Sequence, residues 1–169
     1  RALNIPAGQG MATYAAWAVD PERDSRPLVL LAADQEQAHE MRDHLVRVGI
    51  DAVGGYVTGF EGLPLHTPGL IRPEALDGFD SVLLLDVRAK SEHTAGHIPG
   101  SPQLHGGRVL WNLDQIPDEG TIVTYCQSGV RSSVVASTLR HKGYDVVELD
   151  GSYLAWAAQQ DSLASTSAR

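Results

Sequence analysis

The residue with the clearest chemical potential is Cys126, the only cysteine in the chain. It opens the segment Cys126-Gln-Ser-Gly-Val-Arg-Ser132, which comes after a short apolar run and precedes a stretch with helical spacing. A loop at such a junction gathers backbone N–H groups and the positive end of a helix dipole. Arg131 adds a permanent cation. Each of these stabilises an anion at sulfur, so the sequence predicts a Cys126 pKa below the free value of about 8.5.

A thiolate in an anion-binding loop is suited to nucleophilic attack on an anionic or electron-poor centre. Gly129 supplies the conformational freedom that such a loop needs. A lone cysteine is more often a small buried hydrophobic residue than a catalyst, but a position between strand and helix, with glycine and arginine after it, favours the nucleophile. The residues expected to bind the substrate are Gln127, Ser128, Gly129, Val130, Arg131 and Ser132.

Composition excludes several other classes of function. One cysteine cannot form an intramolecular disulfide or a multi-cysteine metal site. The net charge of -8 argues against a surface for nucleic acid or anionic membrane. No apolar run approaches the ~18 residues of a membrane span, and nothing resembles a signal peptide. We therefore expect a cytoplasmic protein with no nucleic-acid or membrane partner.

The seven histidines form neither His-x-His-x-Asp-His nor His-Glu-x-x-His. His93 and His97 have the four-residue spacing of metal ligands on a helix, but proline and glycine come at once after them and no third ligand is evident. No metal and no cofactor are expected.

The elements that would position Cys126 can be predicted from hydrophobic patterning. Apolar runs predict strands, and a spacing of three to four residues predicts a helix. The predicted strands are 81–86, 121–125 and 145–149, and the predicted helices are 73–76, 131–141 and 153–158. Strands that alternate with helices indicate a parallel sheet, here of about five strands, with helices on both faces.

The first half of the chain repeats this scheme, with a buried strand expected at 27–33, a helix at 35–49 and a strand at 51–57. Leu45–Val53 aligns with Leu139–Val147 at a constant shift of 94 positions. In that register Ala32 stands opposite Cys126, so only the second copy can use a cysteine.

Three segments together resemble the rhodanese sulfurtransferase family. Cys126–Ser132 is similar to the active-site loop of that family. The second segment is the stretch 85–100. In it, Leu85-Asp-Val-Arg88, with Glu92 soon after it, is similar to the family's Asp-x-Arg at a strand end, and Gly96-His-Ile-Pro-Gly100 is similar to its Gly-His-Ile-Pro-Gly turn.

The third segment is Leu149-Asp-Gly151 with Trp156 after it, which is similar to the closing Gly-Gly…Trp of the family. Ser152 is a departure, because the family usually has a second glycine there. The resemblance covers roughly residues 70 to 160. Ala2–Pro6 is also similar to the family's residues just after the Gly-His-Ile-Pro-Gly turn, so the first half resembles a rhodanese unit that opens late.

The resemblance implies a domain organisation. Residues 1–59 would be a partial, degenerate rhodanese-like unit, 60–72 a linker, 73–160 a complete rhodanese-like domain and 161–169 a disordered tail. Such a chain resembles tandem rhodaneses, or the C-terminal part of a metallo-β-lactamase/rhodanese fusion. We expect the first unit to pack on the second or to be completed by a second copy or an upstream domain.

The resemblance also implies a mechanism: Cys126 takes a sulfane sulfur from thiosulfate or a persulfide and passes it, as a Cys126 persulfide, to a thiol acceptor. The alternative is a non-catalytic persulfide carrier or docking module. A cysteine phosphatase is disfavoured, because four residues separate Cys126 from Arg131, whereas those phosphatases resemble one another in having five.

Four residues are expected to support the loop. Charges at strand ends that can pair are usually structural, which applies to Asp86, Arg88 and Glu92, with Arg88 also able to lend charge at the pocket mouth. His97 is expected to have a structural hydrogen-bonding role, because a thiolate whose pKa is already lowered needs no base.

Overall fold

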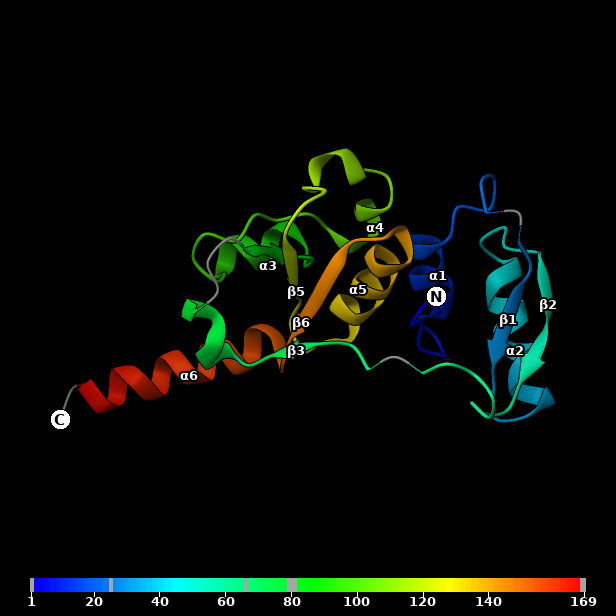
Figure 1. Cartoon of the computed structure of the whole chain (residues 1–169), viewed down its shortest axis with the longest axis horizontal. Helices are drawn as coiled ribbons and strands as arrows, with labels where there is room; N and C mark the ends of the chain where they lie inside the picture. Colours follow the sequence, from blue (N-terminus) through cyan, green and yellow to red (C-terminus); the bar gives the residue numbers. More distant parts are fainter. Residues whose placement is uncertain (1, 25, 66, 79–81, 168–169) are drawn as a thin grey trace. The chain divides into compact units, whose positions relative to one another are not determined.

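The chain folds as two units (Figure 1). The N-terminal unit is Ile5–Thr67, and the C-terminal unit combines Arg1–Asn4 with Pro68–Arg169. The computed structural model describes residues 2–24, 26–65, 67–78 and 82–167. Among these residues no helix is long and apolar enough to cross a lipid bilayer.

The C-terminal unit is built on a four-stranded sheet in the order β3-β6-β5-β4, with every neighbouring pair parallel. The strands are β3 (Leu70–Ile71), β4 (Val82–Asp86), β5 (Thr121–Tyr125) and β6 (Asp145–Leu149). In β5, which lies between two neighbours, residues 122–125 are all buried, as an apolar run in a parallel sheet should be.

The prediction of about five strands is corrected to four. After α3 (Lys90–Ala95) the chain returns beside β4, where the described residues form one isolated bridge, between Asp86 and Gln103. The Asp86 N–H donates to the Pro102 carbonyl at 3.0 Å. Because Pro102 itself has no N–H to donate, the ladder cannot extend from this bridge toward the start of β4.

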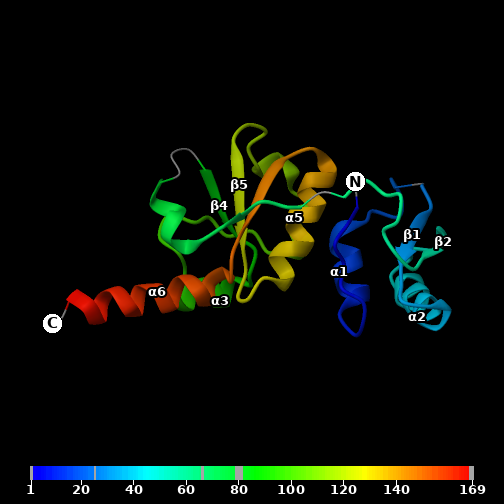
Figure 2. The same cartoon turned by 60° about the horizontal axis from the view of Figure 1, so that its bottom comes forward.

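Helices cover both faces of this sheet, as predicted (Figure 2). On one face α5 (Val130–Lys142) places Val135 and Leu139 against Ile122 of β5. On the other face Tyr153 and Trp156 of α6 (Ser152–Ser167) pack on the cluster that contains Val123 and Tyr125. The remaining helical segments of the unit are α3 (Lys90–Ala95), α4 (Gly106–Val109), η1 (Pro73–Gly78) and η2 (Leu113–Gln115). The alternation of side chains along β5 therefore divides the core into two layers.

Two further segments differ from the sequence-based expectation. β3 lies inside the predicted linker, where two residues are too few to show a period; Ile71 pairs with Leu149 of β6. Helix α6 (Ser152–Ser167) continues through the predicted disordered tail as far as Ser167. The Ser165 and Thr166 hydroxyls there donate to carbonyls four residues earlier, at 2.8 and 3.0 Å, so they do not compete with the helix.

In the N-terminal unit β1 (Leu28–Leu31), α2 (Gln35–Val46) and β2 (Val53–Val57) come after α1 (Met11–Ala18), which is not among the predicted elements. β1 and β2 are parallel. This strand–helix–strand order is that of β5, α5 and β6, as the 94-residue repeat predicts.

The strand expected to be buried at 27–33 is buried only in part. Leu30 is buried, whereas Val29 is 64% exposed and Leu31 44% exposed. The sheet has only two strands, and side chains alternate between its faces, so one face of β1 is covered and the other is not.

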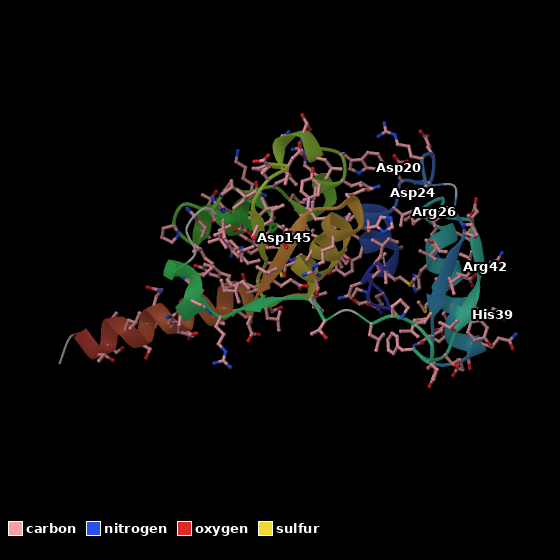
Figure 3. The ribbon with its side chains drawn as sticks, viewed as in Figure 1. Asp20, Asp24, Arg26, His39, Arg42 and Asp145 are labelled. Atoms are coloured by element: carbon pink, nitrogen blue, oxygen red, sulfur yellow. The ribbon has the colours of Figure 1, made fainter. Side chains whose placement is uncertain are left out.

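Helix α2 has one buried face, which carries Ala38, Met41 and Leu45. His39 and Arg42, labelled in Figure 3, are exposed. The turn before β1 is held by Asp20 and Asp24, also labelled there: the Asp20 N–H donates to Asp24 Oδ2 at 3.1 Å.

Truncation of a core side chain should lower the stability of the C-terminal unit. Leu139 is fully buried on α5, so we expect Leu139→Ala to lower the free energy of unfolding by about 2–5 kcal/mol. The control is Leu154→Ala, because Leu154 is 52% exposed; its effect should stay within about 0.5 kcal/mol. Urea unfolding monitored by circular dichroism measures both. Equal effects would contradict the placement of α5.

Candidate active site

Cys126 lies directly after β5, three residues before the helical cap of α5, and is 1% exposed. Gly129 is the N-cap of α5, with φ 114° and ψ −30°, a conformation that a residue with a side chain resists. This turn brings the Gly129 N–H to 3.1 Å from Cys126 Sγ. The strand end, the glycine and the helix start together point backbone donors at the sulfur.

The environment of the sulfur favours the thiolate. Burial raises the pKa of Cys126, but hydrogen bonds from the Ser132 hydroxyl and from the N–H groups of Ser132, Gly129 and Ser128 outweigh it, so the pKa lies below its ordinary value. The Ser132 Oγ is 3.6 Å from Sγ. These donors come from neutral groups, whose dipoles stabilise negative charge without a counter-ion.

The other loop residues predicted to bind substrate have different surroundings. Gln127 accepts a hydrogen bond on Oε1 from Arg88 Nη1 at 3.2 Å. Val130 is 48% exposed.

Arg131, expected to bind the substrate as a permanent cation, forms a bidentate ion pair with Glu92: Nη1 is 2.7 Å from Oε2, and Nη2 is 2.8 Å from Oε1. The Glu92 hydrogen bond raises the pKa of Arg131 above its ordinary value, and the Cys126 sulfur adds to this effect. Arg131 is therefore within electrostatic reach of the sulfur, but its forked donors are taken by Glu92. Glu92 Oε2 also accepts the Ala89 N–H at 3.0 Å, which fixes the start of α3.

Arg88 and Asp86 form a buried pair at the end of β4. Arg88 is 1% exposed and Asp86 is fully buried. The guanidinium donates to both Asp86 oxygens, through Nε at 3.0 and 3.1 Å and through Nη2 at 2.8 Å. Burial raises the pKa of Asp86, but the hydrogen bonds from Arg88 and His93 together lower it by more. The pKa therefore lies below its ordinary value, and the carboxyl stays ionised.

The same guanidinium joins four segments of the chain. Besides Asp86 and Gln127, Arg88 donates from Nη2 to the Gly96 carbonyl at 2.8 Å. Its Cζ lies 4.1 Å from the ring centre of Tyr153 and 5.5 Å from that of Tyr125. One buried cation thus links β4, the turn at Gly96, the cysteine loop and the start of α6, as the expected structural role requires.

The histidines sit behind this pair. His93 Nδ1 is 3.0 Å from Asp86 Oδ2. His97, which is exposed, donates from Nδ1 to the His93 carbonyl at 3.0 Å, and the two rings stack 3.9 Å apart. Sequence patterning treats His93 only as one half of a metal spacing and misses its contact with Asp86. Within the described residues no three His, Cys, Asp or Glu side chains cluster as metal ligands would.

Two other sets of residues were not predicted. The Tyr125 hydroxyl is 2.7 Å from Ser101 Oγ and accepts the Ile98 N–H at 3.3 Å, which holds the turn at 96–100. The start of α6 also reaches the loop: the Tyr153 and Leu154 N–H groups donate to the carbonyls of Cys126 and Gln127. The sequence marks this region by Leu149-Asp-Gly151 and by the departure from glycine at Ser152, but neither indicates the contact with the cysteine loop.

Deletion of the Ser132 hydroxyl should weaken the thiolate. We expect Ser132→Ala to raise the pKa of Cys126, because that hydroxyl lowers it, and to slow alkylation at pH 7 about tenfold. The rate of iodoacetamide alkylation between pH 5 and pH 10 gives the pKa of wild type and variant. An unchanged profile would show that backbone N–H groups alone set the pKa.

The Glu92–Arg131 ion pair should make the free energy of unfolding depend on pH in the acidic range. The hydrogen bond from Arg131 lowers the pKa of Glu92 from 4.5 to about 2 in the folded protein. A carboxyl whose folded pKa is lowered stabilises fully above its unfolded pKa and loses that contribution as the pH falls. The difference in unfolding free energy between wild type and Glu92→Gln should therefore be constant above pH 5 and shrink between pH 4.5 and about 2. Urea unfolding at several pH values measures it; a difference independent of pH would contradict the ion pair.

Comparison with known proteins agrees with this geometry. Residues 73–159 match the family model of the rhodanese-like domain. A sulfurtransferase of Allochromatium vinosum is 37% identical over 79 residues, which cover 46% of this chain and 74% of that protein. The thiosulfate sulfurtransferase GlpE of Pseudoalteromonas translucida is 35% identical over 86 residues, 50% of this chain and 81% of that protein.

Among solved structures, the reduced CoADR-RHD of Bacillus anthracis superposes with a TM-score of 0.51 at 28% identity, over 53% of this chain and 16% of that chain. The family match begins at residue 73, so the N-terminal unit lies outside it. The chain therefore belongs to the rhodanese-like domain family, through its C-terminal unit.

Proposed function

We propose that this protein is a sulfurtransferase that accepts the outer sulfur of thiosulfate or of a persulfide on Cys126. The observation that carries the proposal is the convergence of the Ser128, Gly129 and Ser132 donors on a buried cysteine sulfur. That arrangement holds a thiolate ready to attack. The same N–H groups can also hold the terminal sulfur of a persulfide, which is itself an anion at neutral pH.

In the first step the Cys126 thiolate attacks the outer sulfur of thiosulfate. A new S–S bond forms, the S–S bond of thiosulfate breaks, and sulfite leaves with the bonding electron pair. No proton needs to move, because nucleophile and leaving group are both anions. The loop therefore needs to supply positive potential more than a general base.

In the second step an acceptor thiolate attacks the terminal sulfur of the persulfide. The acceptor gains the sulfane sulfur, the S–S bond to Cys126 breaks, and the Cys126 thiolate departs. The donors that lower the pKa of Cys126 make it a better leaving group here. One loop thus serves both half-reactions.

Charge in this site is expected to come mainly from dipoles. Arg131 is paired with Glu92 and Arg88 with Asp86, so each nearby cation is matched by a carboxylate. The developing negative charge would meet the N–H groups and the Ser132 hydroxyl, with Arg131 adding longer-range attraction. This refines the expectation that Arg131 is the best candidate for neutralising the charge of the donor.

Phosphate-ester hydrolysis is the less favoured chemistry. The loop has four residues between Cys126 and Arg131, and the Arg131 fork that would grip phosphate oxygens bidentately is bound to Glu92. A persulfide carrier that loads sulfur but releases it slowly is the closer alternative, and turnover separates it from the enzyme.

We further propose that the N-terminal unit is a degenerate, partial rhodanese-like unit, as in a tandem protein. Supporting it are the parallel β1-α2-β2 order and the match of the buried residues Leu45 and Leu139 at a shift of 94. Ala32 stands where Cys126 does in the second copy. On this proposal all sulfur loading depends on Cys126.

Replacement of the nucleophile should abolish transfer. We expect Cys126→Ser to lower kcat/KM for sulfur transfer from thiosulfate to cyanide by about 10³-fold or more, because the hydroxyl is a far weaker nucleophile at neutral pH. The control is Ser137→Ala, which deletes a buried hydroxyl on α5 that donates to the Val134 carbonyl and accepts the Asn4 N–H, with both partners outside the cysteine loop; it should keep the wild-type rate. Equal rates for Cys126→Ser and wild type would refute a sulfurtransferase that acts through Cys126. A wild-type protein that takes up one sulfur but does not turn over would instead be a persulfide carrier.

A further inference from the structure

Ser152 has a backbone conformation that serine normally avoids. Its φ is 55°, and among the described residues it is the only one other than glycine with positive φ. It is fully buried. A side chain in this left-handed region carries strain that glycine escapes, so the surrounding contacts must hold Ser152 there.

The Ser152 hydroxyl lies in a ring of hydrogen bonds that begins and ends on Cys126. The Cys126 N–H donates to Ser152 Oγ at 3.3 Å. Ser152 Oγ is 3.4 Å from Ser132 Oγ, and Ser132 Oγ is 3.6 Å from Cys126 Sγ. Ser152 Oγ accepts from the Cys126 N–H, and because the single hydrogen of Ser132 Oγ is used toward Cys126 Sγ or the Gly129 carbonyl, the hydrogen between the two serine oxygens comes from Ser152 Oγ.

That direction matters for the thiolate. Ser132 has one hydroxyl hydrogen, which either Cys126 Sγ or the Gly129 carbonyl, 2.9 Å away, can accept. When Ser152 donates to Ser132 Oγ, the Ser132 hydrogen cannot point back along that bond. The donated bond also polarises the Ser132 hydroxyl and strengthens its own donation. Both effects strengthen donation by Ser132, and a thiolate, as the charged acceptor, attracts that hydrogen more strongly than the neutral Gly129 carbonyl does.

The backbone of Ser152 has a second effect on the loop. The left-handed turn at Gly151 and Ser152 starts α6. The next two N–H groups, of Tyr153 and Leu154, then donate to the carbonyls of Cys126 and Gln127 at 3.0 and 3.1 Å. Two carbonyl groups of the cysteine loop are thereby held by N–H groups at the start of α6.

We propose that Ser152 is a positioning residue for Cys126, one whose hydroxyl aims the Ser132 hydroxyl at the sulfur and whose left-handed turn fastens the loop to α6. The proposal rests on Cys126 as the nucleophile of the proposed function. It assigns to the start of α6, 26 residues after the cysteine, a part in setting the reactivity of the thiolate.

Two substitutions separate the hydroxyl from the backbone. Ser152→Gly deletes the hydroxyl and takes the left-handed conformation freely, and Ser152→Ala deletes the hydroxyl but keeps the strain. We expect both to shift the pH profile of iodoacetamide alkylation of Cys126 upward and to slow alkylation at pH 7 about two- to fivefold. Ser152→Gly should melt at or above the wild-type temperature, since the strain is relieved.

Ser137→Ala serves again as the matched control and should leave the alkylation profile unchanged. A wild-type profile for Ser152→Gly would overturn the proposal, because a merely structural serine is replaced there without loss. A shift in Ser152→Ala alone would overturn it too, since strain and not the hydroxyl would be the cause. Alkylation needs no sulfur donor, so this test stands whether or not the protein transfers sulfur from thiosulfate.

Discussion

The convergence of neutral donors on the Cys126 sulfur is the interaction on which the rest of the C-terminal unit depends. Burial raises the pKa of the Cys126 thiol, and the Ser132 hydroxyl together with the loop N–H groups more than reverses that effect. Those groups can point inward because β5 ends at Tyr125 and α5 begins at Val130, with Gly129 in a conformation that closes the turn. The fold therefore supplies the anion site as a consequence of its strand-to-helix connection.

Ion pairs around the cysteine loop hold it in position. Arg88 with Asp86 and Arg131 with Glu92 are both paired, and each arginine joins segments far apart in sequence. A buried pair costs desolvation and contributes little net stability, but loss of one partner is expensive. The two pairs thus hold the loop in one geometry, while the N–H dipoles and the Ser132 hydroxyl stabilise the anion.

Local patterns in the sequence were sufficient to predict β4, β5, β6, α5 and the cysteine loop, because apolar runs and helical spacing are written within a few neighbouring residues. Pairing was harder to predict. The Arg131–Glu92 contact spans 39 residues, β3 has two residues, and the expected fifth strand is reduced to one bridge beside Pro102. The contact of Ser152 with Cys126 depends on where α6 starts, which tertiary packing decides. Family resemblance indicated Cys126–Ser132 as the candidate site, but it did not indicate the pairing of Arg131 with Glu92.

The intact mass of the protein after treatment with thiosulfate tests most directly whether Cys126 is a thiolate that carries sulfur. We predict a gain of one sulfur atom, located by peptide mapping on Cys126, formed at neutral pH and removed by a thiol. A protein that keeps its mass under these conditions, or that gains sulfur equally when Cys126 is replaced by serine, would contradict it.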